Sequence, residues 1–432
     1  MAGIFPFGEY LDVSLLLVLS AVAIPIARKM SVVEIPILIF IGLIVGPFLR
    51  LISPAFSVYL FSSFAGVGIG MIGLVIILYS ESHNMNIKVL KSSFYRIASL
   101  DTIGVIITAL VAAGLFSLFT GAPLIIGFLF GAIISPTDPV TLIPLFRRMK
   151  ISEDISEVLI GESLFNDPVG IILVSVGIAI LAPHSVYVSL FSSIANSISF
   201  YPGIVAYFLI QVAVPSVVGV AIGFAIIYLN KEINFENYLT AILLGVVIFE
   251  FTIFEGISIT PFPAIIATGA IVGNFSDKGI FWQREKNFQE NLSYLSTSII
   301  FLLIGSSFTI NEIEQYILLG IMLTTILIFV VRPAAVFPSI LIADLGKIKM
   351  KGYYKIVAFI SLVGPRGVVP VVLSTLPYVV GLSYNIPILI TWGPVIGVSA
   401  LFIVLFSIVF QTIYTPIMKN IFIPDQGNGN SK

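Results

Sequence analysis

The sequence predicts an all-α polytopic membrane protein with about 13 transmembrane helices, arranged as two inverted repeats whose broken helices cross at the middle of the membrane. Three observations favour this fold class. The chain is 58% hydrophobic and 10% charged, whereas soluble domains carry about 25% charged residues. Its apolar runs are long enough to span a bilayer. Two of these runs, the fifth and the twelfth, contain proline-rich polar segments.

The apolar runs also predict the topology. The first run, 11–27, follows an acidic segment rather than the basic segment of a signal peptide, so it is expected to remain as the first helix. If the N-terminus lies outside, every Lys and Arg outside the spans except Arg50 falls on the inner side, as the positive-inside rule requires. We therefore expect a transmembrane domain over 1–418 in the cell membrane and a short cytoplasmic tail over 419–432.

The fifth span contains Ser-Pro-Thr-Asp-Pro at 135–139, and the twelfth contains Gly-Pro-Arg-Gly at 364–367. Proline removes a backbone donor and clashes with the preceding turn, so both helices should break. Freed backbone groups persist at membrane depth only if they are buried in protein or line a wet cavity. Breaks at corresponding places in two halves indicate an inverted-repeat transporter with a midplane ion site. Ordinary proline kinks are the alternative, but they leave the polar residues unexplained.

Composition argues against several other classes. The chain has no Cys and only two His, distant in sequence, and its net charge of −1 includes no basic face for a nucleic acid. The GxGxxG pattern at 68–73 lies inside an apolar run, so it predicts close helix packing rather than dinucleotide binding, as does the pair Gly42 and Gly46. We expect no cofactor and no enzymatic activity.

The sixth span contains the polar segment Gly-Glu-Ser-Leu-Phe-Asn-Asp-Pro at 161–168. A carboxylate at the bilayer centre costs at least about 3 kcal/mol, so an acid there indicates ion or proton movement. Asp167 is the first candidate for the carrier, because a proton and a small hard cation can compete for one carboxylate. Ser163 lies one turn earlier on the same helical face, and Thr137 can offer a backbone carbonyl. A structural, hydrogen-bonded role is the alternative for Asp167.

Other charged residues in the apolar runs are expected to be paired, because an unpaired buried charge costs several kcal/mol. Glu162 and Arg366 form the candidate structural ion pair, joining the sixth and twelfth spans. Asp138 is expected either to face helix N-termini at the crossing or to act as a second ligand. Asp101 is a secondary site candidate for which a structural role is favoured. Arg332 is expected to snorkel or to pair with an acid.

The three segments 161–168, 135–139 and 364–367 together resemble the monovalent cation/proton antiporters, in particular the electroneutral NhaP-type Na+/H+ exchangers. The resemblance covers nearly the whole chain. It implies that Na+ or Li+ and H+ are the transported ions. It also implies a homodimer in contact with membrane lipids, in which a six-helix core moves past a dimerisation part like an elevator. The core would comprise spans 4–6 and 11–13, and the dimerisation part spans 1–3 and 8–10.

The resemblance also implies roles for single residues. Asp167, the Ser163 side chain and the Thr137 carbonyl would bind Na+, and Asn166 would hold the geometry of the site. Glu81 ends the third apolar run, where a solvated acid is the simpler interpretation, but the family places an acid from this span at or beside the ion. Glu162 and Arg366 match the helix-linking ion pair of the family.

Asn166 bears on stoichiometry. Electrogenic relatives carry two adjacent acids, whereas Asn166-Asp167 leaves one carrier and implies exchange of one Na+ for one H+. A K+/H+ antiporter of the same fold is the near alternative. An ion channel would need a filter, and no filter-like repeat is present in the sequence. An intramembrane aspartyl protease could use Asp138 and Asp167, but its Gly-x-Gly-Asp signature is absent.

Overall fold

A computed structural model describes residues 7–30, 34–53, 57, 69–138, 143–185, 188–277, 279–344 and 352–423. Its ordered elements are helices, and no strand occurs in these ranges. Six helical stretches within them are long and apolar enough to cross a membrane: Lys91–Thr120, Asp154–Leu181, Tyr201–Ile233, Glu236–Gly256, Ile310–Ala343 and Pro387–Phe422. The chain is thus an all-helical, multi-pass membrane protein, while the number of 13 spans stays a prediction.

The helices of the first half are α1 Phe7–Met30, α2 Glu34–Leu43 with the π-helical η1 Ile44–Phe48, α4 Ile69–Asn84, α5 Ile87–Ser99, η2 Leu100–Gly104, α6 Val105–Thr120, α7 Leu124–Ile134, α8 Ile143–Arg148, α9 Glu153–Leu181 and α10 Ser189–Ile198. Those of the second half are α11 Phe200–Ile233, η5 Glu236–Tyr238, α12 Leu239–Gly256, α13 Phe262–Phe275, α14 Ile280–Ser307, α15 Ile310–Ile326, η6 Leu327–Val331, α16 Arg332–Ala343, α17 Tyr353–Leu362, α18 Val368–Ser374, α19 Leu376–Tyr384 and α20 Pro387–Phe422.

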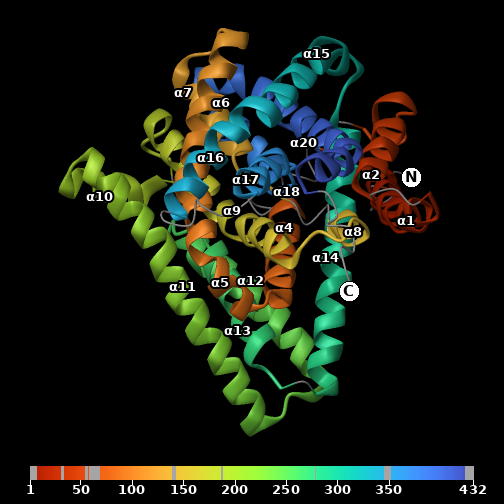
Figure 1. Ribbon diagram of the computed structural model, residues 1–432, viewed down its shortest axis with the longest axis vertical. Helices are drawn as coiled ribbons and strands as arrows, with labels where there is room; N and C mark the ends of the chain where they lie inside the picture. Colours follow the sequence, from red (N-terminus) through yellow and green to blue (C-terminus); the bar gives the residue numbers. More distant parts are fainter. Residues whose placement is uncertain are drawn as a thin grey trace, which may run out of the picture.

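The helices form two groups that meet at α4, α9 and α18. In one group, α14 packs against α1, α2 and α4, while α13 packs against α4 and α11. In the other, α7 packs against α6 and α9, and α20 packs against α15, α17 and α18. Figure 1 shows α1 and α2 on the flank beside α14 and the long α11 on the opposite flank. The helices α4, α9 and α18 therefore lie at the junction of the two groups.

Small residues bring α2 and α14 into close contact, as the glycine spacing predicted. A Cβ on Gly42 would lie 2.2 Å from the Leu302 carbonyl oxygen, and one on Gly46 would lie 2.5 Å from the Ser306 Cα. Separations this short require glycine, because a real Cβ would overlap the facing backbone. Gly42 and Gly46 thus have the packing role expected of them.

Both proline-rich segments are non-helical in the part of the chain that the structure describes. α7 ends at Ile134 and residues 135–138 are irregular, while 363–367 separate α17 from α18. Pro139 lies outside the described residues. The Asp138 backbone N–H donates a hydrogen bond of 2.7 Å to the Pro365 carbonyl. The two irregular segments therefore lie side by side, and each satisfies part of the other's freed backbone.

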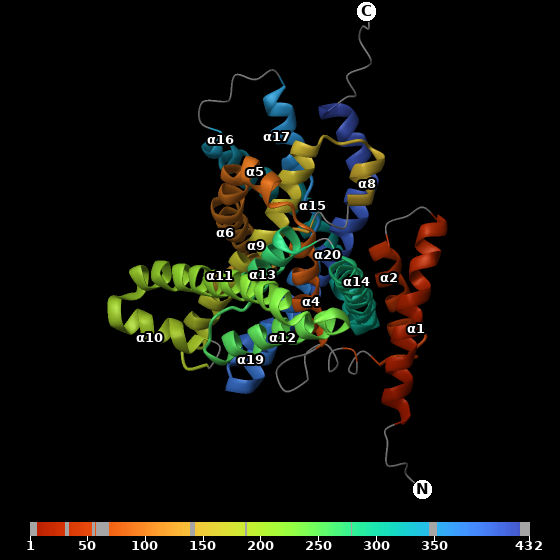
Figure 2. The same cartoon turned by 90° about the horizontal axis from the view of Figure 1, so that it is seen from below.

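The first and last described helices bear on the topology. In Figure 2, the start of α1 lies at the lower edge of the molecule and the end of α20 at the upper edge. Ends at opposite edges of the molecule fit an odd number of spans, and that number stays a prediction. Which face is cytoplasmic stays a prediction from the Lys and Arg distribution.

Candidate cation-binding site

A cavity of about 660 Å³ lies between the two helix groups. Its lining brings together Glu81 of α4, Thr137 and Asp138 of the irregular segment after α7, and Ser163 and Asp167 of α9. These residues come from three separate parts of the sequence. Carboxylates, a hydroxyl and backbone carbonyls are the ligands that hard cations prefer, so the cavity holds the right chemistry for a small cation.

Asp167 is buried in this cavity, with 7% of its surface exposed. In the described part of the chain no donor hydrogen-bonds its carboxylate and no cation pairs with it. The charges of Glu81 and Asp138 act on that of Asp167 from within the same cavity. A structural acid would have a hydrogen-bonding partner. Asp167 instead has two acidic neighbours, and a bound cation or proton would relieve their mutual repulsion.

The position of Asp138 is compatible with either role expected for it, and its role as a second ligand stays a prediction. It lines the cavity, and its side chain also lies against Gly367, the residue immediately before α18. The carboxylate is therefore placed at the start of a helix, where partial positive charge favours an acid. Asp138 is able to contribute an oxygen to the cavity without leaving this position.

The irregular segment after α7 packs against α9 and is hydrogen-bonded to it. A Cβ on Gly170 would lie 2.4 Å from Pro136 Cγ, so only glycine allows this approach. The Asn166 side-chain amide donates to Thr137 Oγ1 at 2.8 Å, and Thr137 Oγ1 donates to Glu162 at 3.4 Å. Asn166 therefore holds the segment 135–138 in position. Because the Thr137 hydroxyl is used in these two hydrogen bonds, the group that Thr137 can present to a cation is its backbone carbonyl.

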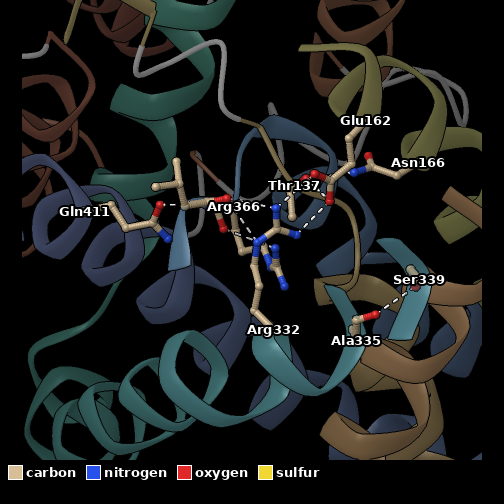
Figure 3. A network of polar contacts seen from close by, with 10 residues as sticks. Thr137, Glu162, Asn166, Arg332, Ala335, Ser339, Arg366 and Gln411 are labelled. Carbon is tan, nitrogen blue, oxygen red and sulfur yellow. Dashed lines mark hydrogen bonds and ion pairs between the residues drawn. The ribbon is translucent and has the colours of Figure 1, made fainter. Parts of the chain in front are cut away.

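The predicted pair of Glu162 with Arg366 is wrong in this structure. Glu162 accepts two hydrogen bonds from Arg332, of 2.7 Å from Nη1 and 2.9 Å from Nη2 (Figure 3). Arg366 donates from Nη1 to the Gly364 carbonyl at 3.2 Å, and its Nε and Nη2 have no partner among the described residues. Glu162 and Arg366 thus lie in one buried polar region without forming the expected ion pair.

The reason lies in the position of the Arg332 guanidinium. Its Nε and Nη2 also donate to the Val363 carbonyl, at 3.1 and 2.8 Å, so the group lies between α9 and the irregular segment before α18. A planar guanidinium matches both oxygens of a carboxylate at once. Arg332 thus takes the two-pronged position on Glu162, while Arg366 Nη1 donates to the Gly364 carbonyl instead. Of the two alternatives expected for Arg332, pairing with an acid is confirmed.

Two π-helical segments carry or precede buried charges. Asp101 lies within η2, between α5 and α6, and Arg332 directly follows η6, between α15 and α16. The two regions touch, since α16 packs against η2. π-Bulges are rare and frequently mark functional sites. The two segments lie in the fourth and eleventh predicted spans, which the predicted inverted repeat would pair.

Asp101 is 4% exposed and is not among the residues that line the cavity. Its carboxylate oxygens have no hydrogen-bond partner in the described ranges, and its charge interacts with those of Glu162, Asp167 and Arg332. Asp101 is therefore close enough to the Glu162–Arg332 pair to interact with its charges, but it does not line the cavity. Because Asp101, like Asp167, has no hydrogen-bonding partner among the described residues, the structural role favoured for it stays a prediction.

The two glycines of Gly-Pro-Arg-Gly each make room for a charged side chain. A Cβ on Gly364 would lie 2.2 Å from Arg332 Nε, and one on Gly367 would lie 2.2 Å from Asp138 Oδ2. The motif thus joins the ion pair to the cavity. Its arginine, by contrast, does not reach Glu162.

The change Gly367→Ala should remove most transport and lower the melting temperature. The added methyl group overlaps Asp138 and displaces the segment that carries Thr137, and overpacking of this kind costs about 1–3 kcal/mol. Gly245→Ala is the matched control, because a Cβ there meets no atom within 4 Å. Transport and thermal unfolding of the two purified variants give the comparison, and a Gly367→Ala protein as active as Gly245→Ala would contradict the steric argument.

Part of the cavity wall was not found from the sequence. α14 contributes Glu290, Ser293, Tyr294, Thr297 and Ser298, a set we call the α14 polar face. The spacing of these residues, i, i+3, i+4, i+7 and i+8, places them on one side of a helix. That periodicity is the signal that could have identified them, although it does not show what the face contacts.

Together, the all-helical membrane fold and the buried, acid-lined cavity define a membrane protein built to bind a small cation. The sequence profile of the sodium/hydrogen exchanger transmembrane family matches residues 15–420. The Na+/H+ antiporter 1 of Methanocaldococcus jannaschii is 32% identical over 375 residues, which are 83% of this chain and 81% of that protein.

A solved structure and a further relative are also similar to this chain. The structure of the sodium proton antiporter MjNhaP1 from Methanocaldococcus jannaschii matches with a TM-score of 0.80 and 27% identity, covering 95% of this chain and 97% of that one. The K+/H+ antiporter NhaP of Alkalimonas amylolytica is 27% identical over 354 residues, 79% of this chain and 55% of that protein. The chain belongs to the sodium/hydrogen exchanger family, as its motifs predicted.

Proposed function

We propose that this chain is a secondary active Na+(Li+)/H+ antiporter in which the two ions compete for Asp167. The observation that carries the proposal is the meeting of Glu81, Asp138 and Asp167 with Ser163 and Thr137 in one cavity. Three acids that share one buried cavity cannot all ionise cheaply without a compensating positive charge. Either a proton or a cation supplies it. Binding one therefore favours release of the other.

One-for-one exchange follows if Na+ replaces a single proton. The site then has the same net charge in both half-cycles, so its movement carries no net charge across the membrane. Asn166 supports this stoichiometry, because its uncharged amide is used to hold Thr137. An acid at this position would add a second titrating group beside Asp167.

Alternating access is proposed to be of the elevator type, with spans 4–6 and 11–13 as the moving core. The location of the cavity supports an elevator mechanism. Ser163 and Asp167 come from α9, within the proposed core, whereas Glu81 comes from α4, outside it. We further propose a homodimer in the cell membrane, with its N-terminus outside and its C-terminus cytoplasmic. α1 presents exposed apolar side chains such as Leu17, Val18 and Val22, which lipid or a second copy would cover.

A side-by-side ion comparison tests the function. Purified protein in liposomes with a preset pH gradient should dissipate that gradient on addition of Na+ or Li+, and much less on addition of K+. K+/H+ exchange is the second candidate, favoured by the Alkalimonas amylolytica relative and by a cavity much larger than one ion. A K+ response equal to the Na+ response would support that candidate and contradict ours.

Electroneutrality needs a separate measurement. We expect an imposed membrane potential to leave the initial rate of Na+-driven pH change unaltered, because no net charge moves. A potential of 100 mV acts on one net charge with about 2.3 kcal/mol, which is enough to alter a rate several-fold. A rate change of that size on imposing a valinomycin-K+ potential would contradict one-for-one exchange.

A further inference from the structure

We propose that the α14 polar face is a ladder of oxygen ligands along which a partly dehydrated cation passes between the exposed end of the cavity and Asp167. The ladder begins at Glu290 and continues through Tyr294, Thr297 and Ser298. This inference rests on the proposed antiport function and adds to it the residues that guide the cation along the cavity.

The geometry of α14 supports a path rather than a single site. All the ladder residues line the same cavity as Asp167. Glu290 to Ser298 covers eight residues, about 12 Å along a helix. The Glu290 side chain is 45% exposed, whereas Ser298 is 2% exposed. Polar groups therefore run along one face from the solvent-accessible end into the buried part of the cavity.

The hydroxyl hydrogens along the ladder are already used within the protein. Thr297 Oγ1 donates to the Ser293 carbonyl and Ser298 Oγ to the Tyr294 carbonyl, each at 2.9 Å. The Tyr294 hydroxyl donates to the Glu34 carboxylate. A hydroxyl has one hydrogen and two lone pairs, so the polar groups that Thr297 and Ser298 offer are oxygen lone pairs. Lone pairs attract a cation and repel an anion.

Elsewhere in the wall, oxygen-bearing side chains such as Ser80 of α4 and Thr412 of α20 are accompanied by aliphatic ones. Leu38 of α2, Leu74 of α4 and Val369 of α18 also line the cavity, and aliphatic side chains cannot replace the water around an ion. Among the charged residues contributed by α2, α8 and α14 are two acids, Glu34 and Glu290, and one base, Arg148. The charged side chains that these three helices contribute to the lining thus carry a net charge of −1, and one of them, Glu290, also lies 3.9 Å from the ammonium group of Lys286.

The change Thr297→Val tests the ladder, because valine keeps the shape and removes the oxygen. The apparent KM for Na+ in proteoliposomes should rise about fivefold, the effect expected for one lost polar contact, with kcat little changed. Thr297→Ser keeps the oxygen and should retain the wild-type KM. Thr325→Val is the matched control: its hydroxyl makes the same i−4 hydrogen bond at 2.8 Å, and it is exposed on α15, outside the cavity lining.

Each outcome decides between alternatives. An unchanged KM in Thr297→Val would overturn the ladder while leaving Na+/H+ exchange by the wild type intact. An equal rise in KM and equal loss of melting temperature in Thr297→Val and Thr325→Val would show that only helix stability had changed, and would also overturn it. A wild-type protein that does not exchange Na+ would overturn the proposed function, and the ladder with it.

Discussion

Replacing Asp167 with asparagine should abolish Na+/H+ exchange in proteoliposomes while the protein still folds. Asparagine has nearly the same shape but cannot release a proton or carry the negative charge that binds the cation. Because the Asp167 carboxylate has no hydrogen-bond donor among the described residues, its neutralisation breaks no contact. It should even relieve repulsion from Glu81 and Asp138, so we expect a melting temperature equal to or above that of the wild type.

A second acid on the same helix provides the control. Asp154 lies near the start of α9 and is exposed, outside the cavity. Asp154→Asn should therefore transport at close to the wild-type rate. The carrier assignment is lost if Asp167→Asn protein retains Na+-dependent proton flux, or if both variants lose transport equally.

The second large effect concerns stability and follows from the Glu162–Arg332 pair. Glu162 is 3% exposed and Arg332 4% exposed, and two hydrogen bonds join them. Removing one partner from a buried ion pair leaves an uncompensated charge and costs about 3–5 kcal/mol. We therefore expect Glu162→Gln and Arg332→Ala to lower the melting temperature strongly. Arg332→Lys should rescue little, because an ammonium group cannot bind both oxygens in the same fork.

A double-mutant cycle distinguishes the observed pair from the one that the sequence suggested. Coupling between Glu162 and Arg332 should be large, and that between Glu162 and Arg366 small. The Arg96–Asp344 pair, with an Arg side chain that is 29% exposed, serves as the comparison and should contribute less because solvent screens it. Stronger coupling of Glu162 to Arg366 than to Arg332 would refute the arrangement in Figure 3.

Much of the site could be predicted from local sequence. Asp167 and Ser163 share one helical face by spacing alone, and the cost of an intramembrane acid indicated a function. The proline-rich segments predicted where the helices are interrupted, and the structure is irregular at both places. Glu81 needed the family resemblance. Its place at the end of an apolar run looks like that of a solvated acid, and only the packing of α4 against α14 and α9 turns it toward the cavity.

The remaining features depend on which side chain reaches which neighbour. Burying either guanidinium group, that of Arg332 or that of Arg366, in an apolar run costs a similar free energy. Nothing in the sequence indicates which of the two approaches Glu162. The π-helical segment η6 and the missing Cβ of Gly364 bring Arg332 into that place. The α14 polar face has a visible periodicity, but its role depends on the cavity between two helix groups distant in sequence.

The central claim is that Na+ and a proton compete for Asp167, and proton release on Na+ binding tests it most directly. Purified protein in weakly buffered detergent solution would be titrated with radioactive Na+ while the pH is recorded. We predict one proton released for each Na+ bound, and neither binding nor release in Asp167→Asn. Na+ binding without proton release, or the release of two protons for each Na+, would contradict the account.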